Sequence, residues 1–363
     1  MRVVHDSVAR VLDRAVADSA FPGAISVVGT RDGTITSYAV GRIDWPANAP
    51  APDENTMWDI ASLTKVVGMT TAMMQLVEQD RVELDAPVAR YLPEFVGEGK
   101  ERVTVRHLLT HSSGLPAWRA LYKEASNADP ALALVFQTPL DTVPGARMMY
   151  SDLGAILLGK IVERVSGEPL DVYIARHITR PLGMTATTYR PDTSLRPRIA
   201  PTEFDPWRQR HIRGEVHDEN AYMLGGVSGH AGLFSTAADL TRFARMMLGG
   251  GTLDGARIVR ASTIAQFTAV QDPTLSHRAL GWETPSGQNS AGHRMSARAF
   301  GHTGFTGTSL WIDPERGVFV LLLTNRVNPS RQNTRIGLVR IALADAAMAA
   351  LDGASAPSTP STP

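Results

Sequence analysis

The sequence predicts a mixed α and β protein in which a single antiparallel sheet is assembled from both ends of the chain. Strand-like runs rich in β-branched and apolar residues occur in two pairs, each joined by a short turn, at 24–29, 34–40, 308–312 and 318–324. The terminal stretches 4–16 and 336–351 carry apolar residues at helical spacing, as does much of the middle of the chain. Helices that flank an antiparallel sheet, with a helical lobe between the two sheet-forming ends, are the simplest assembly of these elements.

We expect two lobes and a tail. Residues 1–60 and 232–352 are predicted to form the sheet domain, and residues 61–231 a helical domain. The chain from Ala354 onward contains only Ala, Ser, Thr and Pro, which cannot form a core, so 353–363 is predicted to be disordered. Further helices are expected at 103–110, 153–165 and 170–178. Another is expected to begin at Thr236, where Asp239 completes a capping-box-like start. Residues 191–215 are expected to form an irregular excursion.

The composition excludes several classes of function. The chain has 363 residues, 43% of them hydrophobic, and Lys plus Arg balance Asp plus Glu at 36 each, so no nucleic-acid or membrane partner is expected. The absence of cysteine excludes thiol catalysis, disulfides and cysteine-based metal sites. We see neither a signal peptide nor a membrane span, which favours a cytoplasmic location for an untrimmed chain. The oligomeric state is left open.

Ser62 and Lys65 lie where a buried helix is predicted to begin. From Val66 to Val77 apolar residues cover more than one helical face, which is typical of a core helix. Three residues apart, Ser62 and Lys65 project from neighbouring points of the first turn. Unpaired N–H groups at a helix start could stabilise an oxyanion formed at an activated serine. A serine that only caps the helix is the alternative, because Ser-x-x-Lys alone is a short motif.

Two later motifs strengthen the catalytic interpretation. Tyr150-Ser151-Asp152 precedes a predicted core helix, and His302-Thr303-Gly304 accompanies the C-terminal strands. In this order, the three motifs resemble those of the serine β-lactamase and penicillin-binding protein superfamily. The chain looks most similar to the class C β-lactamase-related branch that includes the family VIII carboxylesterases, and it would then have the β-lactamase/transpeptidase-like fold. Segments 103–115 and 232–240 also resemble recurrent family segments, so the resemblance extends over about residues 4–350.

The resemblance implies a role for each catalytic residue. Ser62 would be the nucleophile, Lys65 the cation that helps to activate it, and Tyr150 the general base. A phenol has a pKa near 10, but a nearby ammonium favours its ionised form, which can take a proton from serine and return it to the leaving group. The implied oxyanion hole consists of the backbone N–H groups of Ser62 and Phe305. This chemistry needs no cofactor and no metal.

Substrate binding is implied for Asp152, His302, Thr303 and Gly304. His302 stands where the family usually has lysine, so a permanent cation is replaced by a side chain that is largely neutral at pH 7. Asp152 stands where an asparagine is usual, and a carboxylate can only accept hydrogen bonds. Both changes weaken recognition of β-lactams and peptide carboxylates, which favours an esterase that cleaves small carboxylic esters. His302 could equally be structural, and Asp152 could simply cap the following helix.

Two other functions stay open. The first is an amide hydrolase with the same machinery, acting as a β-lactamase, a D-amino-acid peptidase or a muropeptide amidase. The second is a non-catalytic, penicillin-binding-type protein. In either case the partner is a small-molecule ester or amide.

The segment 190–220 is rich in basic residues, namely Arg196, Arg198, Arg208, Arg210 and His211, followed by His217-Asp218-Glu219-Asn220. It is either a solvated loop or a rim for anionic substrates, and the His-Asp-Glu-Asn run looks like one found in family members that act on muropeptides. His217, Asp218 and His230 match no standard metal-ligand spacing, so no metal site is predicted.

Overall fold

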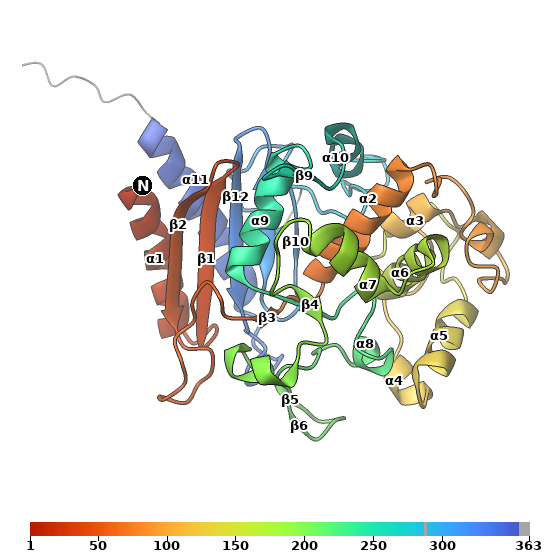
Figure 1. Ribbon diagram of the computed structural model, residues 1–363, viewed down its shortest axis with the longest axis horizontal. Coiled ribbons are helices and arrows are strands. Elements are labelled where there is room, and N and C mark those ends of the chain that lie inside the picture. Colours follow the sequence, from red (N-terminus) through yellow and green to blue (C-terminus); the bar gives the residue numbers. More distant parts are fainter. Residues whose placement is uncertain (287–288, 356–363) are drawn as a thin grey trace, which may run out of the picture.

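The computed structural model describes residues 1–286 and 289–355 and contains a five-stranded antiparallel sheet in the order β10-β11-β12-β1-β2. The two ends of the chain meet at its centre, where β1 pairs with β12 and places Val27 opposite Leu321. The predicted fold class is therefore confirmed (Figure 1). The strands are β1 (Gly23–Thr30), β2 (Thr34–Gly41), β10 (Phe300–Thr303), β11 (Ser309–Asp313) and β12 (Val318–Thr324).

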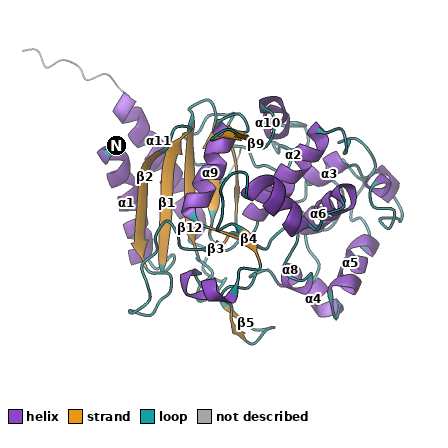
Figure 2. Cartoon of the chain, viewed as in Figure 1, coloured by secondary structure: helices purple, strands orange, loops and turns teal. Residues whose placement is uncertain are grey.

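Helices cover both faces of this sheet, as Figure 2 shows. Helices α1 (Arg2–Ala17) and α11 (Ile336–Ser355) pack together on one face, and α9 (Ala237–Leu248) packs on the other. Successive side chains of β1 point to opposite faces of the sheet. Val28 packs in the cluster beneath α1 and α11, and Val27 packs in the core beneath α9. Burial on both faces explains why β12 is apolar almost throughout.

The helical lobe lies beside the sheet and contains most of the remaining helices. They are α2 (Thr71–Glu78), α3 (Val105–Leu109), α4 (Leu121–Glu124), α5 (Ala128–Gln137), α6 (Asp152–Ser166), α7 (Leu170–Ile174), α8 (Glu219–Met223) and α10 (Ala261–Thr268). Short 3₁₀ turns are η2 (Val88–Arg90), η3 (Lys100–Arg102) and η5 (Thr193–Arg198). A small three-stranded sheet contains β3 (Trp58–Asp59), β7 (Leu233–Ser235) and β4 (Thr188–Tyr189), in that order. Two further pairs of short strands are β5 (Phe204–Asp205) with β6 (Arg210–His211), and β8 (Thr252–Leu253) with β9 (Ala256–Arg257).

The helix after Ser62 is buried, as predicted, but it opens with a wide π-helical turn, η1 (Lys65–Thr70), before α2 begins. All six residues of η1 are buried. The backbone at Gly68 approaches the core closely, because a Cβ there would lie 2.8 Å from Cδ1 of Ile174. A second π-turn, η4 (Ala175–Thr179), follows α7, so the single helix predicted at 170–178 has two parts.

Several expected boundaries need correction. Helix α5 was not predicted, and the excursion expected at 191–215 contains the β5–β6 hairpin. Thr236 caps α9 through Asp239 N, but the Asp239 carboxylate binds Ala186 N and Thr187 instead of completing a capping box. Helix α11 continues to Ser355, three residues into the predicted tail, and 356–363 lies outside the described residues. The lobe boundaries stay a prediction. Among the described helices, none has the length and apolar character needed to cross a bilayer.

Candidate active site

Ser62 lies at a sharp turn between β3 and the buried helix. Strand β3 is fixed to β7, and Ile60 N continues this contact by donating to Leu233 O at 3.1 Å. The buried Asp59 carboxylate accepts Ala61 N at 2.8 Å. Ala61 has a φ of 46°, a left-handed conformation that non-glycine residues adopt infrequently. The chain is thereby turned so that Ser62 lines a cavity.

Lys65 is 1% exposed and its ammonium has three oxygen partners. The Nζ atom lies 2.8 Å from Ser62 Oγ, 2.9 Å from His230 O and 2.8 Å from Asp152 Oδ1. Burial by itself lowers the pKa of Lys65, but the charges of Asp152 and Tyr150 outweigh it, and the net direction is upward. Lys65 is therefore held as an ammonium beside the serine hydroxyl.

Tyr150 precedes α6 and completes this group. Its ring centroid is 5.0 Å from Lys65 Nζ. The residue as a whole is half-buried, but its hydroxyl oxygen is fully enclosed and has no well-formed hydrogen bond to a described residue. Burial raises the pKa of Tyr150, whereas the Lys65 charge and the proximity of Ser62 lower it, and the net direction is upward. The structure thus brings together the three residues predicted to be catalytic.

His111 packs against Tyr150 from a segment that precedes it in the chain. We did not predict this contact from the sequence. Its Nδ1 accepts the backbone N–H of Ser151 at 3.1 Å, and its ring lies 4.5 Å from that of Tyr150. Burial lowers the pKa of His111 well below its usual value, so the imidazole is neutral. His111 lies in segment 103–115, which was noted only for its family resemblance, and nothing in its local sequence indicates that it reaches residues 150 and 151.

The predicted oxyanion hole is shaped by the loop after β10. Thr306 Oγ1 donates to Asp59 O at 2.7 Å, and Thr308 Oγ1 donates to Ile60 O at 3.1 Å, so this loop is fastened to the segment before Ser62. Gly304 is required there because a Cβ would lie 2.5 Å from Ile60 O. In the part of the chain that the structure describes, the N–H groups of Ser62 and Phe305 have no hydrogen-bond partner.

A cavity of about 230 Å³ opens at Ser62. Its lining includes three predicted site residues besides Ser62, namely Tyr150, Asp152 and Phe305. It also includes His217, Asp218 and Glu219 from the segment 190–220, whose role was left open, and Trp118 and Arg331, which were not singled out in the sequence. His302 does not line it. The imidazole is 1% exposed, donates through Nδ1 to Thr303 O at 2.8 Å, and lies behind Tyr150 with ring centroids 5.8 Å apart. The substrate contact expected of the His302 side chain is therefore not available in this arrangement.

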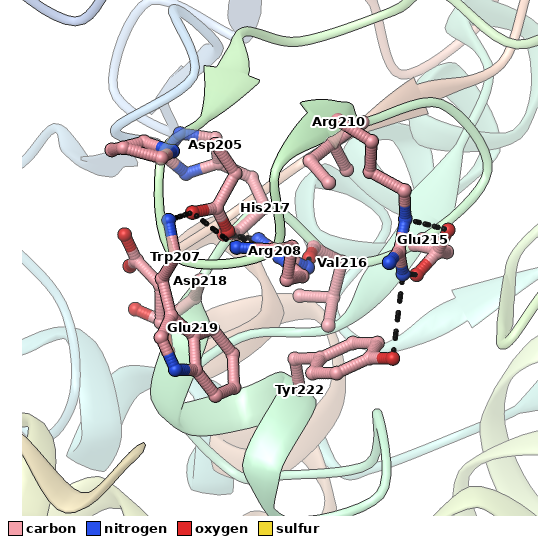
Figure 3. Close-up of polar contacts among 12 residues, drawn as sticks. Asp205, Trp207, Arg208, Arg210, Glu215, Val216, His217, Asp218, Glu219 and Tyr222 are labelled. Atoms are coloured by element: carbon pink, nitrogen blue, oxygen red, sulfur yellow. Dashed lines mark hydrogen bonds and ion pairs between the residues drawn. The ribbon is translucent and has the colours of Figure 1, made fainter. Parts of the chain in front are cut away.

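Residues 217–219, at the end of the segment 190–220, form one wall of this cavity. Arg208 is only 3% exposed, pairs with Asp205, and donates to Val216 O at 2.7 Å and His217 O at 2.6 Å (Figure 3). Arg210 pairs with Glu215 at 2.5 Å nearer the surface. Neither a solvated loop nor an anion-binding rim describes Arg208, because its charge is neutralised internally. Its hydrogen bonds hold the backbone of the wall.

The two histidines considered for a metal have carboxylate partners instead. His217 Nε2 lies 2.7 Å from Glu203 Oε1, and His230 Nε2 lies 2.9 Å from Asp218 Oδ1. The first pair supports Phe305, whose ring stacks on His217 at 5.7 Å. The second fixes the residue whose carbonyl oxygen binds Lys65.

The fold is that of the β-lactamase and penicillin-binding protein class of serine hydrolases. The family model described as Beta-lactamase matches residues 8–344. The chain therefore belongs to the β-lactamase family, and it is a serine hydrolase of that family.

Curated relatives carry two kinds of name. The chain is 34% identical to "N-acetylmuramyl-L-alanine amidase" of Bacillus subtilis (strain 168), over 87% of this chain and 80% of the relative. It is 35% identical to "Putative D-alanyl-D-alanine carboxypeptidase" of Escherichia coli (strain K12), over 75% of this chain and 69% of the relative.

Solved structures share the fold at lower identity. "EstCE1, a hydrolase with promiscuous acyltransferase activity" superposes with a TM-score of 0.77 at 22% identity, covering 96% of this chain and 99% of the other. A penicillin-binding protein homologue from Caulobacter crescentus gives a TM-score of 0.78 at 23% identity, covering 96% and 97%. At these identities the likeness shows the fold alone.

Proposed function

We propose that this protein hydrolyses small carboxylic esters through an acyl-enzyme formed on Ser62. The observation that carries the proposal is the position of Lys65 Nζ, 2.8 Å from Ser62 Oγ, in an enclosed site that also holds the Tyr150 phenol. A serine hydroxyl needs both a proton acceptor and a positive environment to become a nucleophile, and these two neighbours supply them.

The reaction proceeds in two balanced steps. The Tyr150 phenolate, a minor species near neutral pH because burial raises the pKa of this phenol, takes the Ser62 proton while Oγ attacks the ester carbonyl carbon. The resulting oxyanion is bound by the N–H groups of Ser62 and Phe305, and collapse expels the alcohol, which receives the proton from Tyr150. Water then attacks the acyl-enzyme and gives a proton to Tyr150; collapse of the second tetrahedral intermediate releases the acid, and Tyr150 returns that proton to Ser62 Oγ. Lys65 stays protonated throughout and stabilises the charges on its neighbours.

The preference for esters rests on the lack, among the described residues of the cavity, of an unneutralised cation that could bind a substrate carboxylate. His302 is buried and its pKa is lowered to about 4 chiefly by burial, so it supplies no positive charge near neutral pH. Asp152 is a carboxylate already engaged by Lys65. Arg331 lines the cavity, but Glu203 and Glu219 neutralise it. A simple ester needs no such anchor.

A second candidate is cleavage of the amide bond between N-acetylmuramic acid and a peptide. The amidase relative from Bacillus subtilis favours it, because the identity extends over most of both chains. Trp118 adds support: it lines the cavity, is 46% exposed, and offers the flat apolar face that ring-shaped ligands pack against. The bond cleaved would change, but the acyl-Ser62 chemistry would not.

A substrate panel tests both candidates. We expect p-nitrophenyl acetate or butyrate to give a higher kcat/KM than nitrocefin, a D-alanyl-D-alanine peptide or N-acetylmuramyl-L-alanine. Ser62→Ala should lower ester hydrolysis by about 10³-fold or more, whereas Ser126→Ala, on an exposed serine outside the site, should not.

Mass spectrometry locates the acyl group. A fluorophosphonate should add one adduct, on Ser62. Preference for the muramyl amide would replace the ester proposal by the second candidate. No adduct and no hydrolysis of any substrate would favour a non-catalytic, penicillin-binding-type protein.

A further inference from the structure

Two cations face the ring of Tyr150, and only one of them belongs to the motifs found in the sequence. Lys65 Nζ lies 5.0 Å from the ring centroid, and Arg278 Cζ lies 5.1 Å from it. Arg278 comes from the segment between α10 and β10, far along the chain from Lys65. Both distances are within the range of a cation–π contact.

Arg278 is held in this position by an ion pair. Its side chain is 11% exposed, and Nη2 donates to Glu283 Oε1 at 3.0 Å. Glu283 is itself fixed to the strand that carries His302, since its backbone exchanges two hydrogen bonds of 2.9 Å with Gly301. The Nη1 atom of Arg278 is buried and has no partner among the described residues, so its hydrogen-bonding capacity is not used by the fold.

The other groups around Tyr150 make this charge important. His111 and His302 both pack against the ring, and the pKa of each is lowered by burial, with Arg278 adding to the effect. Neither is a cation near neutral pH. Asp152 supplies a negative charge that opposes ionisation of the phenol. The positive charges at Tyr150 among the described residues are therefore Lys65 and Arg278.

We propose that Arg278 is a positioning residue whose permanent charge, set against the Tyr150 ring, favours the ionised form of this phenol. The inference rests on the proposed function, in which Tyr150 accepts the Ser62 proton. Arginine suits this task because its guanidinium does not lose its proton in proteins, and because its planar group can lie against a ring. An enclosed site strengthens the interaction between a cation and a phenolate. Glu283 holds the guanidinium in place and moderates its charge.

Opposite substitutions separate this role from a purely structural one. In Arg278→Gln, the lower apparent pKa of the kcat/KM profile for p-nitrophenyl butyrate should rise by about one pH unit, and kcat/KM at neutral pH should fall about tenfold. Arg278→Lys should restore most of both. Glu283→Gln should shift the same limb in the other direction, because the guanidinium loses its counter-charge. An ion pair that only supports the fold would make Arg278→Gln and Glu283→Gln behave alike, with no shift.

A direct titration keeps the test independent of hydrolysis. The near-ultraviolet absorbance of phenolate, taken as the difference between each protein and the same protein with Tyr150→Phe, reports ionisation at position 150. We expect Arg278→Gln to move this titration to higher pH and Glu283→Gln to move it to lower pH. If neither moves it, the inference is overturned, even where esters are cleaved. If both move it and no ester is cleaved, the proposed function fails while the charge effect stands. Should Arg278→Gln not fold, the Glu283→Gln titration still decides: a move to lower pH supports the inference, and no move overturns it.

Discussion

The ammonium of Lys65 and the carboxylate of Asp152 form a 2.8 Å ion pair at the edge of the cavity, with 1% and 20% of the two side chains exposed. A buried charge is costly unless it is paired, so Asp152 helps to keep Lys65 protonated beside the nucleophile. An ammonium can donate to Ser62 but cannot take its proton. Within the proposed mechanism, the role of proton acceptor therefore falls to the Tyr150 phenol.

Replacing Asp152 by asparagine should move the whole pH profile to lower pH. The Asp152 charge raises the pKa of Lys65 and of Tyr150, so both groups should lose their protons at lower pH in Asp152→Asn. Ester hydrolysis that needs the Tyr150 phenolate and the Lys65 ammonium should therefore both rise and fall at lower pH in Asp152→Asn than in the unmodified protein. The measurement is kcat/KM for an ester against pH, with Asp129→Asn, on an exposed helix start, as the control. An unchanged alkaline limb would contradict the role given to Asp152.

Gly304→Ala should lower kcat without abolishing the fold. The new Cβ would meet Ile60 O at 2.5 Å and Thr308 Oγ1 at 2.1 Å, so the loop that carries Phe305 N must move away from Ser62. Loss of an oxyanion-hole donor costs about 10²-fold or more in kcat. Gly337→Ala is the matched control, because a Cβ there meets nothing within 4 Å. The check is ester kinetics together with urea unfolding of both variants. Normal kcat in Gly304→Ala would count against the proposed oxyanion hole.

The parts of the site that could be predicted from the sequence are those that depend on local spacing. Ser62 and Lys65 are three residues apart at a helix start, and their 2.8 Å contact follows from helical geometry even though the turn widens to a π-helix. The β1–β12 pairing could also be predicted, since hairpin runs at both ends need partners. The Tyr150 position was inferred from the family resemblance, because no spacing rule joins residues so far apart.

The rest depends on tertiary contacts that leave no local pattern. Arg278 and His111 reach Tyr150 from separate segments: Arg278 stands in no recognised motif, and the family-like segment 103–115 gives no sign that His111 contacts Tyr150. Arg208 was grouped with surface arginines, because burial of a charge is decided by its partners in space. Its neutralisation by Asp205 and two backbone carbonyls appears only once the hairpin is folded. His302 was predicted either to contact substrate or to be structural, and the strand places it behind Tyr150.

Arg208 and Arg210 should differ sharply in their contribution to stability. Arg208→Met leaves the Asp205 carboxylate buried without its counter-charge, which should lower the free energy of unfolding by about 3 kcal/mol. Arg210→Met removes a pair in which 44% of Arg210 is exposed, and the loss should stay below about 1 kcal/mol. Urea unfolding at neutral pH compares the two. Equal losses would mean that the buried pair contributes no more than the exposed one, contrary to its position in the cavity wall.

Neutral, buried His302 should make the protein sensitive to acid. Burial lowers its pKa from 6.5 to about 4, so between these values the unfolded chain binds a proton that the folded protein does not. Stability is fully present above pH 6.5 and is lost as pH falls towards 4, by about 3 kcal/mol at most from this residue.

His111, whose pKa is lowered in the same direction, should add to this loss, so removal of one histidine relieves only part of it. His302→Asn keeps a donor for Thr303 O and removes the titration. Urea unfolding at several pH values between 7 and 4 should therefore show a shallower loss of stability in His302→Asn than in the unmodified protein. His277→Asn, at an exposed histidine, is the control and should follow the unmodified protein. An identical acid dependence in His302→Asn would mean that the pKa of His302 is the same in the folded and unfolded protein, contrary to the lowering by burial.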